Sequence, residues 1–139
     1  MKEYTSWALL SAFFAGVTAV LAKKGVENVP VNLAVAIRVV VILAFAVGIA
    51  IVTKQTKIGE VDSKAWVFLT ASGIATGISW LCYFKALSLG PVSAVAPIDK
   101  LGFVVAMVLG FVILREAVKP NVLIGGLVVV VGVLITLKP

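Results

Sequence analysis

The residues of this sequence that could do chemistry are a few charged side chains inside long apolar stretches. Asp99 and Lys100 are adjacent within Val92–Leu114, and Arg38 stands alone within Val31–Thr53. A charge at membrane depth costs at least about 2.5–3.5 kcal/mol on insertion scales, so a chain keeps one where something holds or uses it. We therefore expect these residues to bind a ligand, or else to neutralise one another and lock helices together.

The three charges are expected at one depth in the membrane. At about 1.5 Å per helical residue, Arg38 and Asp99 each lie about 10 Å beyond the start of their stretches. A guanidinium favours a planar carboxylate, so we predict an Arg38–Asp99 pair that leaves Lys100 uncompensated, with Lys85 above it at the mouth. Such a cavity prefers a substrate with a carboxylate or phosphate. The alternative is that Arg38 bonds only backbone carbonyls while Lys85 extends to the interface.

Two further residues, Thr76 and Trp80, add polarity near the middle of residues 65–89. Trp80 is either a wall for the substrate or an ordinary packed aromatic, and we favour packing. Pro97 lies inside the fourth apolar stretch, where its missing N–H predicts a kink next to Asp99. The predicted substrate-binding residues are Arg38, Thr76, Trp80, Lys85, Asp99 and Lys100.

The composition excludes most other kinds of site. The chain is 62% hydrophobic and 13% charged, whereas soluble domains have about 25% charged residues. With no His and with Cys82 alone, neither a zinc site nor a disulfide framework is available. The net charge of +6 does not come from one basic face, because most Lys and Arg residues stand between apolar stretches. We predict no enzyme activity, no nucleic-acid binding, and no metal or cofactor.

Five apolar stretches are long enough to cross a bilayer, whose hydrocarbon core of about 30 Å needs roughly 20 helical residues. They are residues 5–22, 31–53, 65–89, 92–114 and 121–137. Pro30, Pro91 and Pro120 stand at or just before three of the predicted starts, where a missing N–H costs little. We predict an all-α integral membrane protein with five transmembrane helices, in one domain over residues 1–139.

The positive charges between the stretches indicate an orientation, because Lys and Arg are enriched in cytoplasmic loops. The N-terminal side holds Lys2, Lys54, Lys57, Lys64, Arg115 and Lys119; the other side holds Lys23, Lys24 and Lys138, with Lys85 near the boundary. This modest excess of positive charge favours the N-terminus inside and the C-terminus outside. It is also compatible with a minority of molecules that insert in the opposite orientation. We expect a multi-pass protein of the inner or plasma membrane.

The last apolar stretch is nearly all Val, Leu and Ile, with Gly125, Gly126 and Gly132. Inside a bilayer no hydrophobic force drives helices together, so small residues that allow close approach favour association. We predict that these glycines form the interface of a homodimer whose two copies have opposite orientations.

Several short motifs follow one another in order along the chain. They are Trp7–Ser11 followed by Lys23-Lys24, Arg38, Tyr83–Pro91, Ala96–Leu101, and Glu116 at the inner end of the fourth helix. Together they resemble one repeat of the EamA-type domain of the drug/metabolite transporter superfamily, over essentially the whole chain. Ala96–Leu101 is similar to the variant in short five-helix bacterial and archaeal members. Arg115 departs from the family's usual Gly, which argues against a tight turn and for an Arg115–Glu116 or lipid-headgroup contact.

The resemblance implies a permease or exporter of small metabolites. Typical members carry two such repeats in inverted orientation with the substrate path between them, a general transporter design. This chain holds one repeat, so the resemblance implies a dimer that supplies the second half. The rival hypothesis is a non-transporting accessory subunit that needs a second five-helix chain. A third alternative is a lipid-facing path, with headgroups drawn to Lys85 and Lys100.

Overall fold

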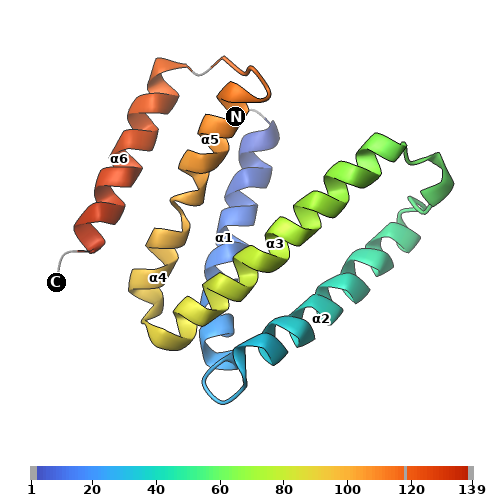
Figure 1. The fold of residues 1–139 in the computed structure, drawn as a ribbon, viewed down its shortest axis with the longest axis horizontal. Helices are drawn as coiled ribbons and strands as arrows, with labels where there is room; N and C mark the ends of the chain where they lie inside the picture. The colour runs from blue at the N-terminus through green and yellow to red at the C-terminus, as the bar shows by residue number, and fades with distance from the viewer. Residues whose placement is uncertain (1–2, 118, 138–139) are drawn as a thin grey trace. The chain divides into compact units, whose positions relative to one another are not determined.

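The computed structural model describes residues 3–117 and 119–137, and its regular structure is entirely helical in that part of the chain (Figure 1). The elements are α1 (Glu3–Gly25), α2 (Val31–Val52), the short 3-10 helix η1 (Ile58–Glu60), α3 (Ser63–Leu89), α4 (Val92–Asp99), α5 (Gly102–Val112) and α6 (Pro120–Thr136). They form two compact units, the first with α1 to α3 and the second with α4 to α6.

The predicted all-α membrane fold is confirmed. Within the described residues, α1, α2, α3 and the combined segment Val92–Val112 are long and apolar enough to cross a membrane. Helix α6 has 17 residues, about 25 Å of helix, which is at the short end of what a bilayer core requires. The helix bounds agree with the predicted spans to within a few residues. Lys2 and Lys138, which entered the orientation argument, lie outside the described residues.

The prolines stand where the sequence placed the helix starts. Pro30 precedes α2 and its carbonyl accepts the Ala34 N–H at 2.9 Å, so the first turn is closed without a donor from the proline. Pro91 does the same for α4, with the Val95 N–H at 3.0 Å. Pro120 is the first residue of α6. A proline costs little at these positions because the first helical N–H groups have no intrahelical acceptor.

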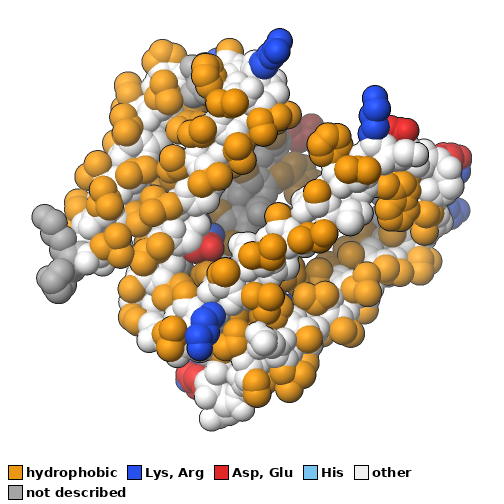
Figure 2. Space-filling model, viewed as in Figure 1, with side chains coloured by type: hydrophobic (Ala, Val, Ile, Leu, Met, Phe, Trp, Pro, Cys, Tyr) orange, Lys and Arg blue, Asp and Glu red, His pale blue; other side chains and the backbone are white. Residues whose placement is uncertain are grey.

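In the first unit, α3 contacts both α1 and α2 (Figure 1), and the packed residues gather at one end. That end holds the last turns of α1, the first turns of α2 and the last turns of α3. Its buried residues are Ala19, Ala22, Val26, Ala34, Val35, Phe84 and Leu87. The alanines leave room for the Phe84 ring, which is 3% exposed. Elsewhere large apolar side chains face outward, as in Figure 2, and lipid is the medium that suits them.

Lys23 closes this packed end by a long-range contact. Its Nζ donates to the backbone carbonyl of Leu87 at 2.7 Å. In a continuous helix the Leu87 carbonyl would accept from the N–H of residue 91, but Pro91 has none. Because Leu87 is fully buried, water is a poor substitute, and the ammonium of Lys23 satisfies the carbonyl instead.

The second unit contains a helix break three residues after Pro97. Instead of one helix over residues 92–114, the structure has α4 and α5, interrupted at Lys100 and Leu101. The Lys100 N–H donates to the Pro97 carbonyl at 3.1 Å, and the Leu101 N–H to the Ile98 carbonyl at 2.9 Å. Both bonds reach back three residues, and the Lys100 N–H also has a longer bond of 3.4 Å to the Ala96 carbonyl, four residues back. The shorter bonds tighten the chain beside Asp99.

The tight turn after α5 is present, which corrects the expectation drawn from Arg115. The N–H groups of Leu114 and Glu116 both donate to the Gly110 carbonyl, at 3.1 and 3.2 Å. Arg115 has φ 54°, a left-handed conformation that glycine adopts at no steric cost. Within the described residues no ion pair joins Arg115 to Glu116. The backbone bonds impose the turn although the side chain disfavours it.

One glycine of helix α6, Gly126, packs against α5 within the second unit. A Cβ at Gly126 would lie 3.3 Å from Phe103 Cε2 and 3.6 Å from Met107 Cε, both on α5. A Cβ at Gly125 or Gly132 would meet no heavy atom within 4 Å among the described residues. Gly126 therefore faces Phe103 and Met107 of its own chain, and the dimer interface predicted at Gly125, Gly126 and Gly132 stays a prediction.

Candidate functional site

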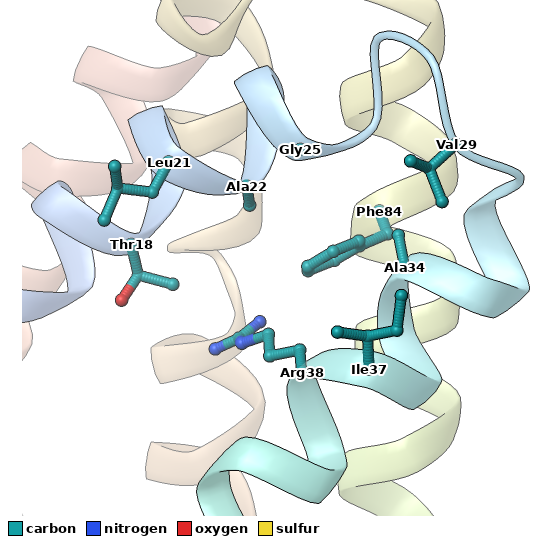
Figure 3. A pocket seen from close by; sticks show the side chains of 9 residues that line it. All are labelled: Thr18, Leu21, Ala22, Gly25, Val29, Ala34, Ile37, Arg38 and Phe84. Atoms are coloured by element: carbon teal, nitrogen blue, oxygen red, sulfur yellow. The ribbon is translucent and has the colours of Figure 1, made fainter.

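A pocket of about 350 Å³ opens at the packed end of the first unit (Figure 3). Its walls come from all three helices and from the loop before α2: Thr18, Leu21, Ala22, Gly25, Val29, Ala34, Ile37, Arg38 and Phe84. The small residues of α1 and α2 that let the helices converge also leave this space beside the Phe84 ring. In Figure 3 the Phe84 ring and the Arg38 guanidinium both point into the space bordered by Ala22 and Thr18.

Arg38 is held by aromatic rings. Its guanidinium carbon lies 4.3 Å from the centre of the Trp80 ring and 5.3 Å from that of Phe84. Trp80 and Phe84 are four residues apart, so both project from one face of α3 toward α2. A cation over an aromatic face gains about 0.5–2 kcal/mol, more when water is excluded. The rings therefore stabilise the charge without neutralising it.

The N–H groups of Arg38 are free for a ligand within this unit. Among the described residues 3–89, Arg38 donates no hydrogen bond and has no carboxylate within 4.0 Å. Two of the four acidic residues in this range, Glu27 and Glu60, pair with Lys24 and Lys57. The alternative that Arg38 bonds backbone carbonyls therefore does not hold there. A stacked ring covers the face of a guanidinium and leaves its edge donors available.

Of the predicted binding residues, the structure brings Arg38 and Trp80 together. Lys85 is exposed and lines a separate hollow with Pro30, Val31, Asn32, Leu81 and Cys82. Thr76 does not line the Arg38 pocket, and its hydroxyl donates to the Ser72 carbonyl of its own helix at 2.8 Å. A back-bonded hydroxyl has used its only proton, so in this arrangement Thr76 could only accept a hydrogen bond, and its place in a substrate site stays a prediction.

Asp99 and Lys100 lie at the break between α4 and α5. Lys100 Nζ is 3.5 Å from Asp99 Oδ2, with the two side chains 59% and 38% exposed. The ammonium that we expected to be uncompensated thus has a local carboxylate. Arg38 and Asp99 belong to different units, and their pairing stays a prediction. A broken helix with charged residues at the break is a recurring feature of transporter sites, because backbone groups are free there to bind substrate or ions.

Sequence reasoning missed Phe84 and Thr18 as pocket residues. The spacing of Trp80 and Phe84 was the available signal for a shared helix face, but nothing local indicated that this face meets Arg38. Nothing in the sequence indicated that Thr18 lines a pocket, because a threonine in an apolar helix usually bonds the backbone of its own helix. Together the pocket residues provide one cation, one hydroxyl and otherwise apolar surface. This arrangement can bind a small molecule.

Comparison with known proteins agrees with these features. The sequence model of the EamA-like transporter family matches residues 4–138. A Sinorhizobium protein named as an uncharacterized transporter in the cobO 3′ region is 47% identical over 116 residues, which are 83% of this chain and 82% of that protein. The two proteins are therefore similar in length. No solved structure matches the chain.

Proposed function

Because the chain belongs to the EamA-like transporter family and is a multi-pass membrane transporter, we propose that it moves a small anionic or zwitterionic metabolite across the plasma membrane. The observation that carries the proposal is Arg38, a cation inside a transmembrane helix that lines a pocket without a carboxylate. An intramembrane cation is expensive to keep unless it has a function. Binding an anion at Arg38 supplies that function.

The transport cycle that we propose needs two copies of the chain. One repeat supplies one wall of a path, and a second repeat in the opposite orientation supplies the other. The similar length of the Sinorhizobium relative supports a one-repeat subunit as the working unit. Helix α6 offers a surface for this contact, because a Cβ added at Gly132 would meet no heavy atom within 4 Å in the part of the chain that the structure describes, and small residues favour close helix packing in lipid.

Asp99 and Lys100 take part as the electrostatic partners of the path. The pair stands at a break in a transmembrane segment, and both Asp99 and Arg38 lie about 10 Å from the starts of their helices. A double-mutant cycle of Arg38→Gln and Asp99→Asn tests whether they act together, with thermal unfolding as the readout. Coupling of about 1 kcal/mol or more supports the pair, and strict additivity refutes it.

Flux measured in sealed vesicles tests the main proposal. The purified chain is reconstituted and assayed for counterflow of small carboxylates, amino acids and phosphate esters. We expect flux of at least one of them, and a loss of about tenfold or more in Arg38→Gln, as expected when a charge-assisted contact of about 1.5–3 kcal/mol is removed. Lys24→Gln is the control, because Lys24 is exposed outside the pocket. Flux only after adding a second five-helix chain would favour the accessory-subunit alternative.

Orientation and assembly need a separate experiment. A cysteine replaces Lys57 in a chain without Cys82, and an impermeant thiol reagent is applied to sealed vesicles from each side. Labelling from both sides supports the antiparallel dimer. Labelling from one side excludes it and leaves a parallel or heteromeric assembly.

A further inference from the structure

The chemical lining of the Arg38 pocket is more specific than a general anion site. Of its nine residues, Arg38 is the only one with a charge and Thr18 the only other one with a polar side chain. The remaining wall consists of Leu, Ala, Gly, Val, Ile and Phe side chains or backbone. A ligand that fills this space must place one negative charge at Arg38 and cover the rest with hydrocarbon.

The charge balance limits the ligand to one negative charge. Lys23, at the same end of the unit, does not line the pocket and donates to the Leu87 carbonyl. Lys85 lines a different hollow. A phosphate monoester or a dicarboxylate would therefore bring a second charge against a wall in which no other lining residue is a cation, and an unpaired charge is strongly disfavoured there.

A zwitterion meets the opposite difficulty. Its ammonium group needs a carboxylate or several acceptors, and no Asp or Glu lines the pocket. The Thr18 hydroxyl is the only side-chain acceptor in the wall. An ammonium next to the guanidinium would also be repelled by it.

The volume and the rings indicate the size and shape of the ligand body. About 350 Å³ corresponds to about a dozen water-sized groups. Phe84 presents its ring to the space (Figure 3), and aromatic rings gain from offset or edge contacts with one another. The pocket thus fits a compact hydrocarbon or aromatic body of that size.

We propose that the substrates of this transporter are amphipathic monoanions, namely monocarboxylates with a compact branched or aromatic hydrocarbon body. The proposal rests on the proposed transport function and narrows it. In the bound state the carboxylate takes the edge N–H groups of Arg38, whose face is covered by Trp80 and Phe84. The hydrocarbon body lies against Leu21, Val29 and Ile37.

A matched ligand series on the unaltered chain tests this proposal. Hydrocinnamate is the monoanion; phenylalanine adds an ammonium, phenylsuccinate adds a second carboxylate, and hydrocinnamamide removes the charge. Dissociation constants are measured by titration calorimetry in detergent. We expect hydrocinnamate to bind about tenfold or more tightly than each of the others, a difference of about 1.4 kcal/mol. Equal or tighter binding of phenylalanine, phenylsuccinate or the amide overturns the proposal.

Variants add a second, independent readout. In Arg38→Gln the preference for hydrocinnamate over its amide should disappear, and in Arg38→Lys it should persist in weaker form, because an ammonium keeps the charge but not the planar edge. Lys24→Gln should keep the full preference. A preference that survives in Arg38→Gln overturns the proposal. If Arg38→Gln does not fold, the ligand series on the unaltered chain decides.

Binding and counterflow together distinguish a failure of the monoanion proposal from a failure of the transport function on which it rests. Counterflow of phenylalanine or phenylsuccinate in vesicles, without binding of hydrocinnamate, leaves the transport function standing and refutes the monoanion class. Absence of counterflow for every compound refutes the transport function of the isolated chain, even where hydrocinnamate binds.

Discussion

Replacing Lys23 should destabilise the protein far more than replacing its neighbour Lys24. Lys23 Nζ donates to the Leu87 carbonyl at 2.7 Å in a part-buried position, whereas Lys24 pairs with Glu27 at 3.3 Å with its side chain 75% exposed. Both residues are lysines in the last turn of α1. They contribute equally to the charge at that helix end and to the orientation signal.

The magnitudes follow from these environments. Lys23→Met keeps the length and apolar stem of the side chain but leaves the Leu87 carbonyl without this donor at a fully buried residue. A hydrogen bond to a charged group contributes about 1.5–3 kcal/mol. An exposed ion pair contributes about 0–1 kcal/mol, so Lys24→Met should change little.

Thermal unfolding of the purified protein in detergent, followed by circular dichroism, measures both variants. At about 4 °C per kcal/mol for a chain of this size, we expect Tm to fall by about 6–12 °C in Lys23→Met and by less than about 4 °C in Lys24→Met. Equal losses in the two variants would refute the role of the Lys23–Leu87 contact, because they would show a general effect of charge.

Three further predictions concern the second unit. Arg115→Gly should stabilise the protein by about 0.5–1 kcal/mol in the same thermal assay, because glycine adopts the left-handed backbone at φ 54° without steric strain. The greater conformational entropy of glycine in the unfolded chain offsets part of this stabilisation. A lower Tm would contradict the prediction. Pro97→Ala should restore a backbone donor inside α4, just before the helix break, raise Tm and lower vesicle flux; unchanged flux would show that the irregular helix is not used in transport. Gly126→Leu should cost about 1–3 kcal/mol by overpacking against Phe103, while Gly132→Leu should keep the subunit stability and shift the protein toward monomer in light scattering. Identical oligomer sizes for Gly132→Leu and the unaltered chain would refute its place in the interface.

The sequence alone determined the helices and their boundaries. Apolar length and proline position are local properties, so residues 31–53 and 92–114 could be identified without knowing their neighbours. An irregularity in the helix that holds Pro97 was expected from the sequence, because proline lacks an N–H wherever its helix packs. The family resemblance followed from the same local motifs, and the match over residues 4–138 confirmed it.

Only the tertiary structure decided what the charged residues contact. Arg38 was predicted to lie beside a carboxylate, and the structure places aromatic rings of α3 over it. Lys23 looked like an orientation signal, yet it bonds a carbonyl 64 residues away. Arg115 occupies a turn that its side chain disfavours, because the bonds to Gly110 outweigh the local preference. Such contacts depend on which helix faces meet, and that choice comes from the packing of small residues such as Ala22 and Ala34, which no local pattern specifies.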